Sequence, residues 1–236
     1  MCTVTFVPST TGYYLTSNRD EKNTRSIAIH PTEYTIDDAK YIFPKDEDAG
    51  GTWIVLKENG DSLCLLNGAL EPFVDNGQYK ISRGKIVLQI ITSNNLLQKY
   101  NTISLYEVAP FTLILLQNNE LYECRWDGSH KNITQLDNTK KHIWSSATLY
   151  NNKQQQKRKD WFNEWQKVTH NPTQKDLLNF HTNTSGNNVE DDLIMNRNNK
   201  YFTVSVTGIE VAQQNSFMFY NDLLNKKSTI TNFTRK

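Results

Sequence analysis

Short strand patterns occur in adjacent pairs along most of this chain. CTVTFVP and YYLTSN flank the turn-like STTG, and strand patterns near 52–57 and 61–67 flank ENGD. A third pair lies in TLILLQNNELYECRWDG and turns at Asn118-Asn119. Two alternating runs joined by a tight turn are typical of β-hairpins, in which neighbouring strands run antiparallel. The sequence therefore predicts a fold rich in antiparallel sheet.

Helical patterns interrupt these hairpins. The apolar spacing from Ser82 to Tyr100 allows a helix, and the tryptophans of NNKQQQKRKDWFNEWQKV lie at helical spacing. We interpret the aromatic stripe of that second helix as core packing and its basic run, 157–159, as a solvated face and not a nucleic-acid site. A third helix is expected over 172–180, with Thr173 as its N-cap.

The order of these elements predicts the fold class. Residues 22–50 show little periodicity, and the acidic KDEDAGG is expected to be a loop with a Gly-Gly turn, whereas KYFTVSVTGIE and NSFMFYNDLL form a closing hairpin. Hairpins, a helix, a hairpin, two helices and a hairpin indicate an α+β fold with largely antiparallel sheets that helices cover. No repeat or linker divides the 236 residues, so we expect a single domain over 1–236.

Charge and cysteine content exclude several classes of function. Lys and Arg number 26 against 25 acidic residues, so the net charge of +1 favours neither nucleic acid nor an anionic membrane. No run approaches the roughly 18 apolar residues of a membrane span, and no secretory signal is visible. The three cysteines have no zinc spacing and indicate a reducing cytoplasm. We expect no cofactor, and we assign the acidic clusters 37–38, 46–48 and 190–192 to solvated loops.

Cys2 follows the initiator methionine directly and allows two interpretations. It is either an ordinary small buried residue at the start of a strand, or the first residue of the mature chain after Met1 is removed. In the second case one residue carries both a thiol and a free α-amine, which together form a nucleophile with a built-in base. Cys64 and Cys124 lie inside strand patterns and are expected to be inert core thiols.

The residues around the first hairpin favour the second interpretation. The strand that ends at Asn18-Arg19-Asp20-Glu21 runs antiparallel to the first strand, so its far end returns toward Cys2. Asp20 is then expected within reach of the Cys2 amine and thiol, and a nearby guanidinium such as that of Arg19 favours thiolate. Asn67 ends a later strand, where its amide is available to a developing oxyanion.

Together these pieces resemble the NRDE family, also called the transport and Golgi organisation protein 2 family. That family in turn is similar to N-terminal-nucleophile (Ntn) hydrolases of the choloylglycine hydrolase and penicillin V acylase type. The resemblance implies a four-layer αββα sandwich and cleavage of linear amides. It rests on Cys2 and Thr3, Asn18 to Glu21, Gly50 to Trp53, Asn67, and the Ser-Ser-Ala-Thr-Leu block at 145–149.

The resemblance also implies roles for individual residues. Cys2 is the implied nucleophile, Asn18 and Asp20 match an Asn-x-Asp motif in which the carboxylate bonds the amine, and Asn67 matches an oxyanion-hole amide. Three supporting positions depart from the hydrolases. Ser17 precedes the motif in place of an Arg, with Arg19 as a substitute; Ser146 stands where an Asn is expected; and Lys200 replaces an Arg, although a lysine cannot reproduce a bidentate fork.

Two functions follow as expectations. The first is a cysteine amidohydrolase acting on a small linear amide or acyl-type compound. The second is a non-catalytic protein that binds or traffics haem or an acyl lipid on the same fold, as the family resemblance implies. The sequence has no CxxCH motif, and its five histidines are scattered, with His142 the one closest to a motif that carries the resemblance.

Overall fold

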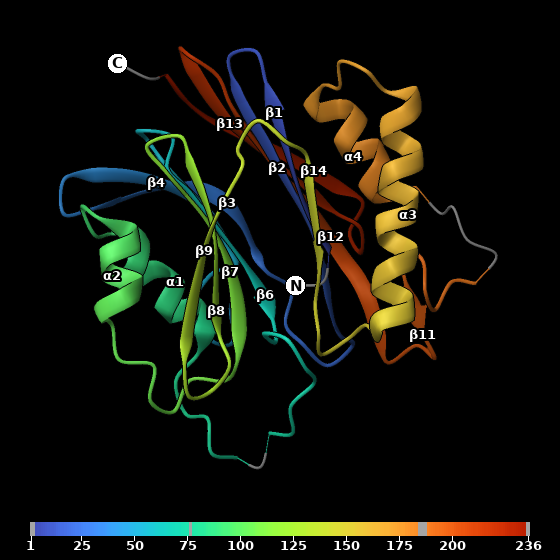
Figure 1. Cartoon of the computed structure of the whole chain (residues 1–236), viewed down its shortest axis with the longest axis horizontal. Helices are drawn as coiled ribbons and strands as arrows, with labels where there is room; N and C mark the ends of the chain where they lie inside the picture. The colour runs from blue at the N-terminus through green and yellow to red at the C-terminus, as the bar shows by residue number, and fades with distance from the viewer. Residues whose placement is uncertain (1–2, 76, 184–187, 235–236) are drawn as a thin grey trace.

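Two antiparallel β-sheets lie face to face, and helices cover their outer faces (Figure 1). The computed structural model describes residues 3–75, 77–183 and 188–234, and within these ranges it contains two seven-stranded sheets and four helices. The resulting αββα sandwich confirms the α+β class and the layer order that the resemblance implied.

The first sheet contains both ends of the described chain. Its strand order is β10-β1-β2-β12-β13-β14, and the short β11 pairs with β12. The first hairpin is confirmed, and the closing hairpin is extended by one further strand, β14. The bounds are β1 Thr3–Ser9, β2 Gly12–Lys22, β10 His142–Ser145, β11 Asn196–Arg197, β12 Tyr201–Val211, β13 Asn215–Asp222 and β14 Lys227–Thr234.

The second sheet follows the sequence order from β3 to β9 without a crossover. Both hairpins predicted in this region are present, including the turn at Asn118-Asn119, where both residues have positive φ. The bounds are β3 Ile29–Ile36, β4 Ala39–Lys45, β5 Ile54–Lys57, β6 Ser62–Asn67, β7 Phe111–Gln117, β8 Glu120–Trp126 and β9 Lys131–Leu136.

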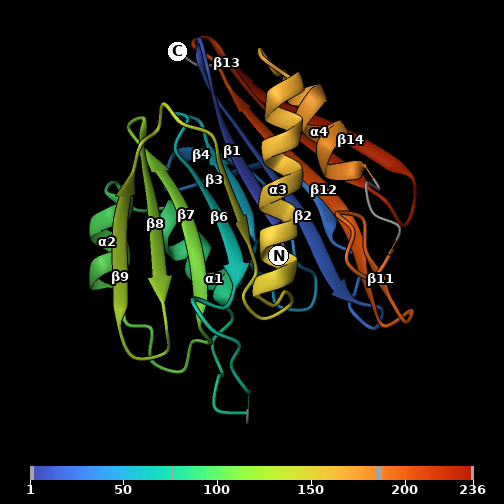
Figure 2. The ribbon, with the colours of Figure 1, turned by 45° about the vertical axis from the view of Figure 1, so that its right-hand side comes forward.

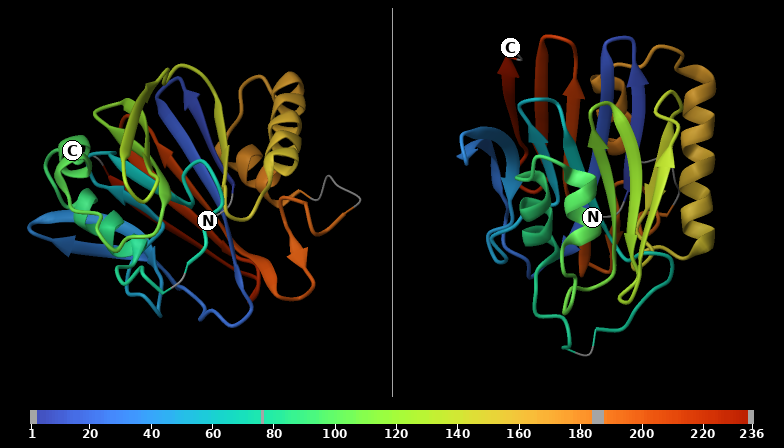
Figure 3. Two further views of the ribbon diagram at one scale, coloured as in Figure 1. Left: turned by 60° about the horizontal axis from the view of Figure 1, so that its bottom comes forward. Right: turned by 60° about the vertical axis from the view of Figure 1, so that its left-hand side comes forward.

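The helices divide between the two outer faces (Figures 2 and 3). Helices α1 (Arg83–Ile91) and α2 (Leu96–Thr102) pack on β5, β6 and β7. Helices α3 (Asn152–Val168) and α4 (Gln174–Thr182) pack on β2, β10 and β12. Thr173 caps α4 as predicted, in a capping box with Asp176. The core prediction for the stripe of α3 holds in part: Trp161 and Trp165 pack partly buried against the cluster of Phe162 and α4, whereas Val168 is 79% exposed.

The apolar core lies between the two sheets. Phe6, Leu15 and Ile209 of the first sheet belong to one buried cluster with Ile54 and Ile114 of the second, and each is at most 2% exposed. Burying a side chain of this size stabilises the fold by roughly 1.5–3 kcal/mol. This core fixes the distance and register between the sheets, and with them the position of every side chain at their shared edge.

Two buried cysteines belong to the same core. Cys64 in β6 and Cys124 in β8 are fully buried, as predicted. Burial raises the pKa of each thiol to about 12, because a thiolate loses its solvation there. Neither residue is therefore a nucleophile at neutral pH.

The chain between these elements differs from the sequence analysis at two places. The loop expected at KDEDAGG is present between β4 and β5, but the weakly periodic residues 22–50 also contain β3 and β4. Strand β3 lies at a sheet edge and contains Pro31, so its alternation is weak, and an edge strand tolerates proline. The stretch from Ser82 to Tyr100 is two helices, since Asn95 caps the start of α2 and ends the continuity.

Among the described residues, we find no helix with the length and apolarity required to cross a membrane.

Candidate functional site

The first hairpin brings the beginning of the described chain beside the Asn-Arg-Asp-Glu motif. Thr3 lies directly opposite Asn18 in the antiparallel register of β1 and β2. The predicted approach of Asp20 to Cys2 concerns a residue outside the described ones. The described strands β1 and β2 are antiparallel, which is the arrangement that the prediction assumed.

Strand alternation divides the motif between two faces of the sheet. Asn18 and Asp20 point toward the layer that contains α3 and α4, where their hydrogen-bond partners lie. Arg19 and Glu21 point toward the second sheet and line a pocket there. The four proposed residues that the structure describes, Asn18, Arg19, Asp20 and Asn67, therefore do not form one continuous cluster.

Asn18 connects β2 to the end of α4. Its amide donates to the carbonyl oxygens of His181 and Leu193, both at 2.9 Å, and its own oxygen accepts from His181 Nδ1. Because Nδ1 donates, His181 Nε2 accepts the hydroxyl of Thr5 at 2.8 Å. Burial lowers the pKa of His181 to about 3, so the ring is neutral at pH 7. His181 is thus the histidine whose ring is hydrogen-bonded to the motif strand β2 and to β1.

Asp20 accepts two short hydrogen bonds on the same side of β2. The hydroxyl of Thr203 donates to Oδ1 at 2.6 Å, and that of Tyr150 donates to Oδ2 at 2.5 Å. Asp20 is only 2% exposed, so these donors replace water around a buried carboxylate. The carboxylate therefore has a fixed orientation.

Two arginines flank the ring of Tyr150. The guanidinium carbon of Arg158 lies 3.5 Å from the ring centroid, and that of Arg197 lies 5.1 Å from it. Arg158 is fully buried and donates to the carbonyl oxygen of Asp192 at 3.0 Å. The assignment of 157–159 to a wholly solvated face was therefore wrong for Arg158, and the assignment of 190–192 to solvated loop was wrong for Asp192, which is fully buried.

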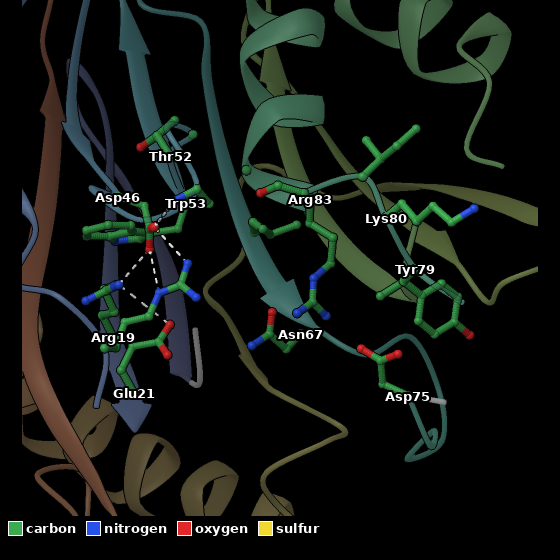
Figure 4. A pocket seen from close by; sticks show the side chains of 18 residues that line it. Arg19, Glu21, Asp46, Thr52, Trp53, Asn67, Asp75, Tyr79, Lys80 and Arg83 are labelled. Carbon is green, nitrogen blue, oxygen red and sulfur yellow. Dashed lines mark hydrogen bonds and ion pairs between the residues drawn. The ribbon is translucent and has the colours of Figure 1, made fainter. Parts of the chain in front are cut away.

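Arg19 and Asn67 line one pocket of about 370 Å³ at the shared edge of the two sheets. Figure 4 shows Arg19, Glu21 and Asp46 on one side of it, and Asn67 and Arg83 on the other. Its walls come from β2, from the end of β6 and from the start of α1. The pocket thus joins two of the predicted site residues across the sandwich.

A buried ion pair holds Arg19 in place. Its Nη2 donates to Asp46 Oδ2 at 2.9 Å, and its guanidinium lies 4.4 Å from the ring of Trp53. Burial alone would raise the pKa of Asp46, but hydrogen bonds from Arg25 and from the Ala49 N–H, with the charges of both arginines, hold it below its usual value. The assignment of Asp46 to a solvated loop was therefore wrong, whereas Asp37 and Asp38 are exposed as expected.

Asn67 lies where β6 ends, and its backbone is anchored there. The hydroxyl of Ser146 donates to the Asn67 carbonyl oxygen at 2.7 Å, and the next N–H, from Gly68, donates to Pro110 at 3.0 Å. Gly68 has φ +81, and a Cβ there would lie 2.9 Å from a methyl carbon of Thr148. Ser146 thus contacts the backbone of Asn67 and fixes the end of β6.

The remaining predicted residues lie apart from the pocket. Lys200 is exposed in the turn before β12 and does not line it. His142 lies in β10, where its Nε2 bonds the Asp137 carbonyl oxygen at 2.7 Å and its ring stacks on Trp144. In the described ranges, no group of three or more His, Cys, Asp or Glu side chains is arranged to hold a metal ion.

Sequence reasoning missed Asp46, Tyr150 and Arg83. Asp46 lies 27 positions from Arg19 and Tyr150 lies 130 from Asp20, so only the fold brings each pair together. For Arg83 the sequence did contain an indication, the two glycines Gly50 and Gly51, because consecutive glycines can mark a place where another backbone comes close. A Cβ on Gly51 would lie 2.3 Å from the carbonyl carbon of Gly84, so that approach places the start of α1 against the pocket.

Solved structures of similar fold support the architecture. An N-acylethanolamine-hydrolyzing acid amidase ortholog from Caenorhabditis elegans has a TM-score of 0.64 at 13% identity, covering 88% of this chain and 92% of its own. A mutant of conjugated bile acid hydrolase from Clostridium perfringens has a TM-score of 0.57 at 10% identity, covering 98% and 92%. A further variant of that hydrolase has a TM-score of 0.56 at 9% identity, covering 100% and 97%. The fold is that of the Ntn hydrolases.

The comparison with curated proteins gives no significant match. The sequence profile described as "Transport and Golgi organisation 2" matches residues 1–226, which is nearly the whole length. That match includes the Asn-Arg-Asp-Glu motif, the Gly-Gly turn before β5 and Asn67. The chain therefore belongs to the Transport and Golgi organisation 2 family.

Proposed function

We propose that this protein is an N-terminal cysteine hydrolase that cleaves a linear amide or acyl-type bond in a small molecule. Cys2 is the nucleophile, its α-amine is the base, and the substrate carbonyl enters the pocket lined by Arg19 and Asn67. Asp20 orients the α-amine from the other side of the strand.

One observation supports the proposal most directly. Arg19 and Asn67, from opposite sheets, line the same pocket, and Thr3, the first described residue, lies opposite Asn18, the neighbour of Arg19 in β2. Consecutive Cα atoms are about 3.8 Å apart, so Cys2 is covalently tied to this edge.

The chemistry proceeds in two balanced steps. The Cys2 thiol gives its proton to the α-amine while sulfur bonds to the substrate carbonyl carbon. Negative charge develops on the carbonyl oxygen, where the Asn67 amide and a backbone N–H stabilise it. The C–N bond then breaks, and the departing amine takes the proton. In the second step water, deprotonated by the α-amine, attacks the thioester, which releases a carboxylic acid and restores the thiol.

Two fold relatives support the choice of reaction. One is named for hydrolysis of N-acylethanolamines, and the other for hydrolysis of conjugated bile acids. Both names describe hydrolases, and the first specifies an amidase.

The direct test is hydrolysis of fluorogenic N-acyl aminocoumarins of increasing acyl length. We expect release of the free amine and, at early times, a mass increase of one acyl group on Cys2. Cys2→Ala abolishes both signals, and Asn67→Ala lowers the rate by about a hundredfold, as loss of an oxyanion donor does elsewhere. Cys124→Ala is the matched control, because it removes a thiol that lies outside the pocket.

The same assay distinguishes the alternative, a protein that binds an acyl lipid or haem without chemistry. Such a binder would release no amine from any member of the series. Cys2→Ala would then bind the aminocoumarins with the affinity of the unmodified protein. That pair of results would overturn the hydrolase proposal.

A further inference from the structure

Arg83 is positioned in the pocket by a close contact between backbones. It is the first residue of α1, and the start of that helix lies against the chain entering β5. The N–H of Thr52 donates to the Gly84 carbonyl oxygen at 3.2 Å, and a Cβ on Gly51 would collide with Gly84 at 2.3 Å. Because only glycine allows this approach, the guanidinium reaches the pocket from a fixed backbone (Figure 4).

The guanidinium of Arg83 has few partners. Its Nη1 donates to the Pro110 carbonyl oxygen at 3.2 Å, and none of the described residues forms an ion pair with it. The first turn of α1 contains no acidic residue that would neutralise it. Burial lowers the pKa of Arg83, while the charges of Glu21 and Asp75 act in the opposite direction. A partly buried cation without a counter-ion is electrostatically costly.

The other cations that line the pocket already have carboxylate partners. Arg19 bonds Asp46 at 2.9 Å, and Arg25 bonds the same carboxylate at 2.7 Å. Lys80 pairs with Glu107 at 2.7 Å. Within the described ranges, Arg83 is therefore the lining cation that lacks an acidic partner.

The pocket also presents Arg83 beside the predicted oxyanion donor. Asn67 and Arg83 lie on the same side of it, across from the Arg19–Asp46 pair. No described residue accepts a hydrogen bond from Nε or Nη2 of Arg83, which leaves N–H groups available to a ligand. A planar guanidinium fits carboxylate, sulfonate or phosphate oxygens with two parallel hydrogen bonds.

We infer that Arg83 binds an anionic group of the substrate, so that the protein acts on anionic amide or acyl compounds. The inference rests on the proposed function for the reacting bond, and it adds the charge of the molecule that carries it. Neutral acyl amides of the same length are then weaker ligands.

Two alkylating reagents of nearly equal size test this directly. Iodoacetate carries a carboxylate, whereas iodoacetamide is neutral, and both modify thiols. We expect Cys2 to react with iodoacetate at least as fast as with iodoacetamide at pH 7. Arg83→Met lowers the ratio of the iodoacetate rate to the iodoacetamide rate by about tenfold, the effect of one charged hydrogen bond. Arg83→Lys keeps the positive charge but loses the two parallel N–H donors of the guanidinium, so we expect an intermediate ratio of the iodoacetate and iodoacetamide rates.

A matched control separates local binding from general charge. Lys85 lies two residues further along α1, is exposed and does not line the pocket. Lys85→Met removes one positive charge and is expected to leave both rates unchanged. An unchanged ratio of the two rates in Arg83→Met, with thermal unfolding as in the unmodified protein, would overturn the inference.

A binding measurement keeps this result separate from the hydrolase proposal. Titration calorimetry with N-octanoylglycine, N-octanoyltaurine and octyl phosphate compares the three anions, and N-octanoylglycine methyl ester is the neutral reference. We expect at least one anion to bind about tenfold more tightly than the ester, and Arg83→Met to remove that preference. Slow labelling of Cys2 together with this preference would contradict only the hydrolase. Equal affinity for ester and anions would contradict the role of Arg83.

Discussion

The hydroxyl of Tyr150 donates a 2.5 Å hydrogen bond to the carboxylate of Asp20, and both residues are at most 2% exposed. Tyr150 follows β10, while Asp20 lies near the end of β2, so the bond connects the helical layer to the motif strand. Thr203 of β12 completes the arrangement from a neighbouring strand. Asp20 thereby has a defined orientation, which the proposed mechanism requires.

Removing that hydroxyl is expected to destabilise the protein. Tyr150→Phe leaves the Asp20 carboxylate with one donor fewer in a buried site, which costs about 1.5–3 kcal/mol of unfolding free energy. We also expect slower alkylation of Cys2, because Asp20 is less well oriented. Urea unfolding and the iodoacetamide rate measure the two effects.

Tyr100→Phe is the matched control. Tyr100 is equally buried, but its hydroxyl has no hydrogen-bond partner among the described residues. Its removal relieves an unsatisfied group, so we expect unchanged or higher stability and an unchanged labelling rate. Equal losses of unfolding free energy in the two variants would contradict a stabilising contribution from the Tyr150–Asp20 hydrogen bond.

Asp46 is expected to be more important than its position in an acidic loop suggests. Asp46→Asn removes the close ion-pair partner of the buried Arg19 and leaves only the longer pair with Glu21 at 3.7 Å, at a cost of about 3 kcal/mol. Asp48→Asn is the comparison, since Asp48 is exposed and pairs only with the half-exposed Arg25, and no measurable loss is expected. Thermal unfolding of both variants gives the answer. Similar melting temperatures would contradict the role of Asp46 in holding Arg19.

The buried histidine predicts a pH dependence. The folded-state pKa of His181 is about 3, below the unfolded value of 6.5, so its contribution to stability is complete above pH 6.5 and is lost as the pH falls toward 3. Between pH 7.5 and 5.5 we expect a loss of about 1.4 kcal/mol, measured by urea unfolding. His181→Gln reduces this difference, whereas His170→Gln, at an exposed position, does not. A flat profile in the unmodified protein would contradict burial of a neutral ring.

Much of the fold was predictable because hairpins are local. The turn at Asn118-Asn119 and the cap at Thr173 depend on a few neighbouring residues, and both are present as predicted. Strand β3 was not predictable, because an edge strand with Pro31 lacks the alternation that a buried strand shows. The break at Asn95 was missed because apolar residues keep a helical spacing on both sides of it.

The site was only partly predictable because its contacts join distant segments. Strand alternation alone places Arg19 and Asp20 on opposite faces, but their partners Asp46 and Tyr150 come from other layers of the sandwich. The basic run 157–159 shows the same limit. Nothing in its composition distinguishes the fully buried Arg158 from its lysine neighbours.

The central claim concerns one thiol, and one measurement tests it most directly. Protein purified from cells is treated briefly with limiting iodoacetamide at pH 7, and intact mass and peptide mapping follow. We predict a chain without Met1 that is alkylated at Cys2, faster than a short cysteine peptide, while the buried Cys64 and Cys124 stay unmodified. Retention of Met1 in most molecules, or equally slow alkylation of all three cysteines, would contradict an N-terminal cysteine nucleophile.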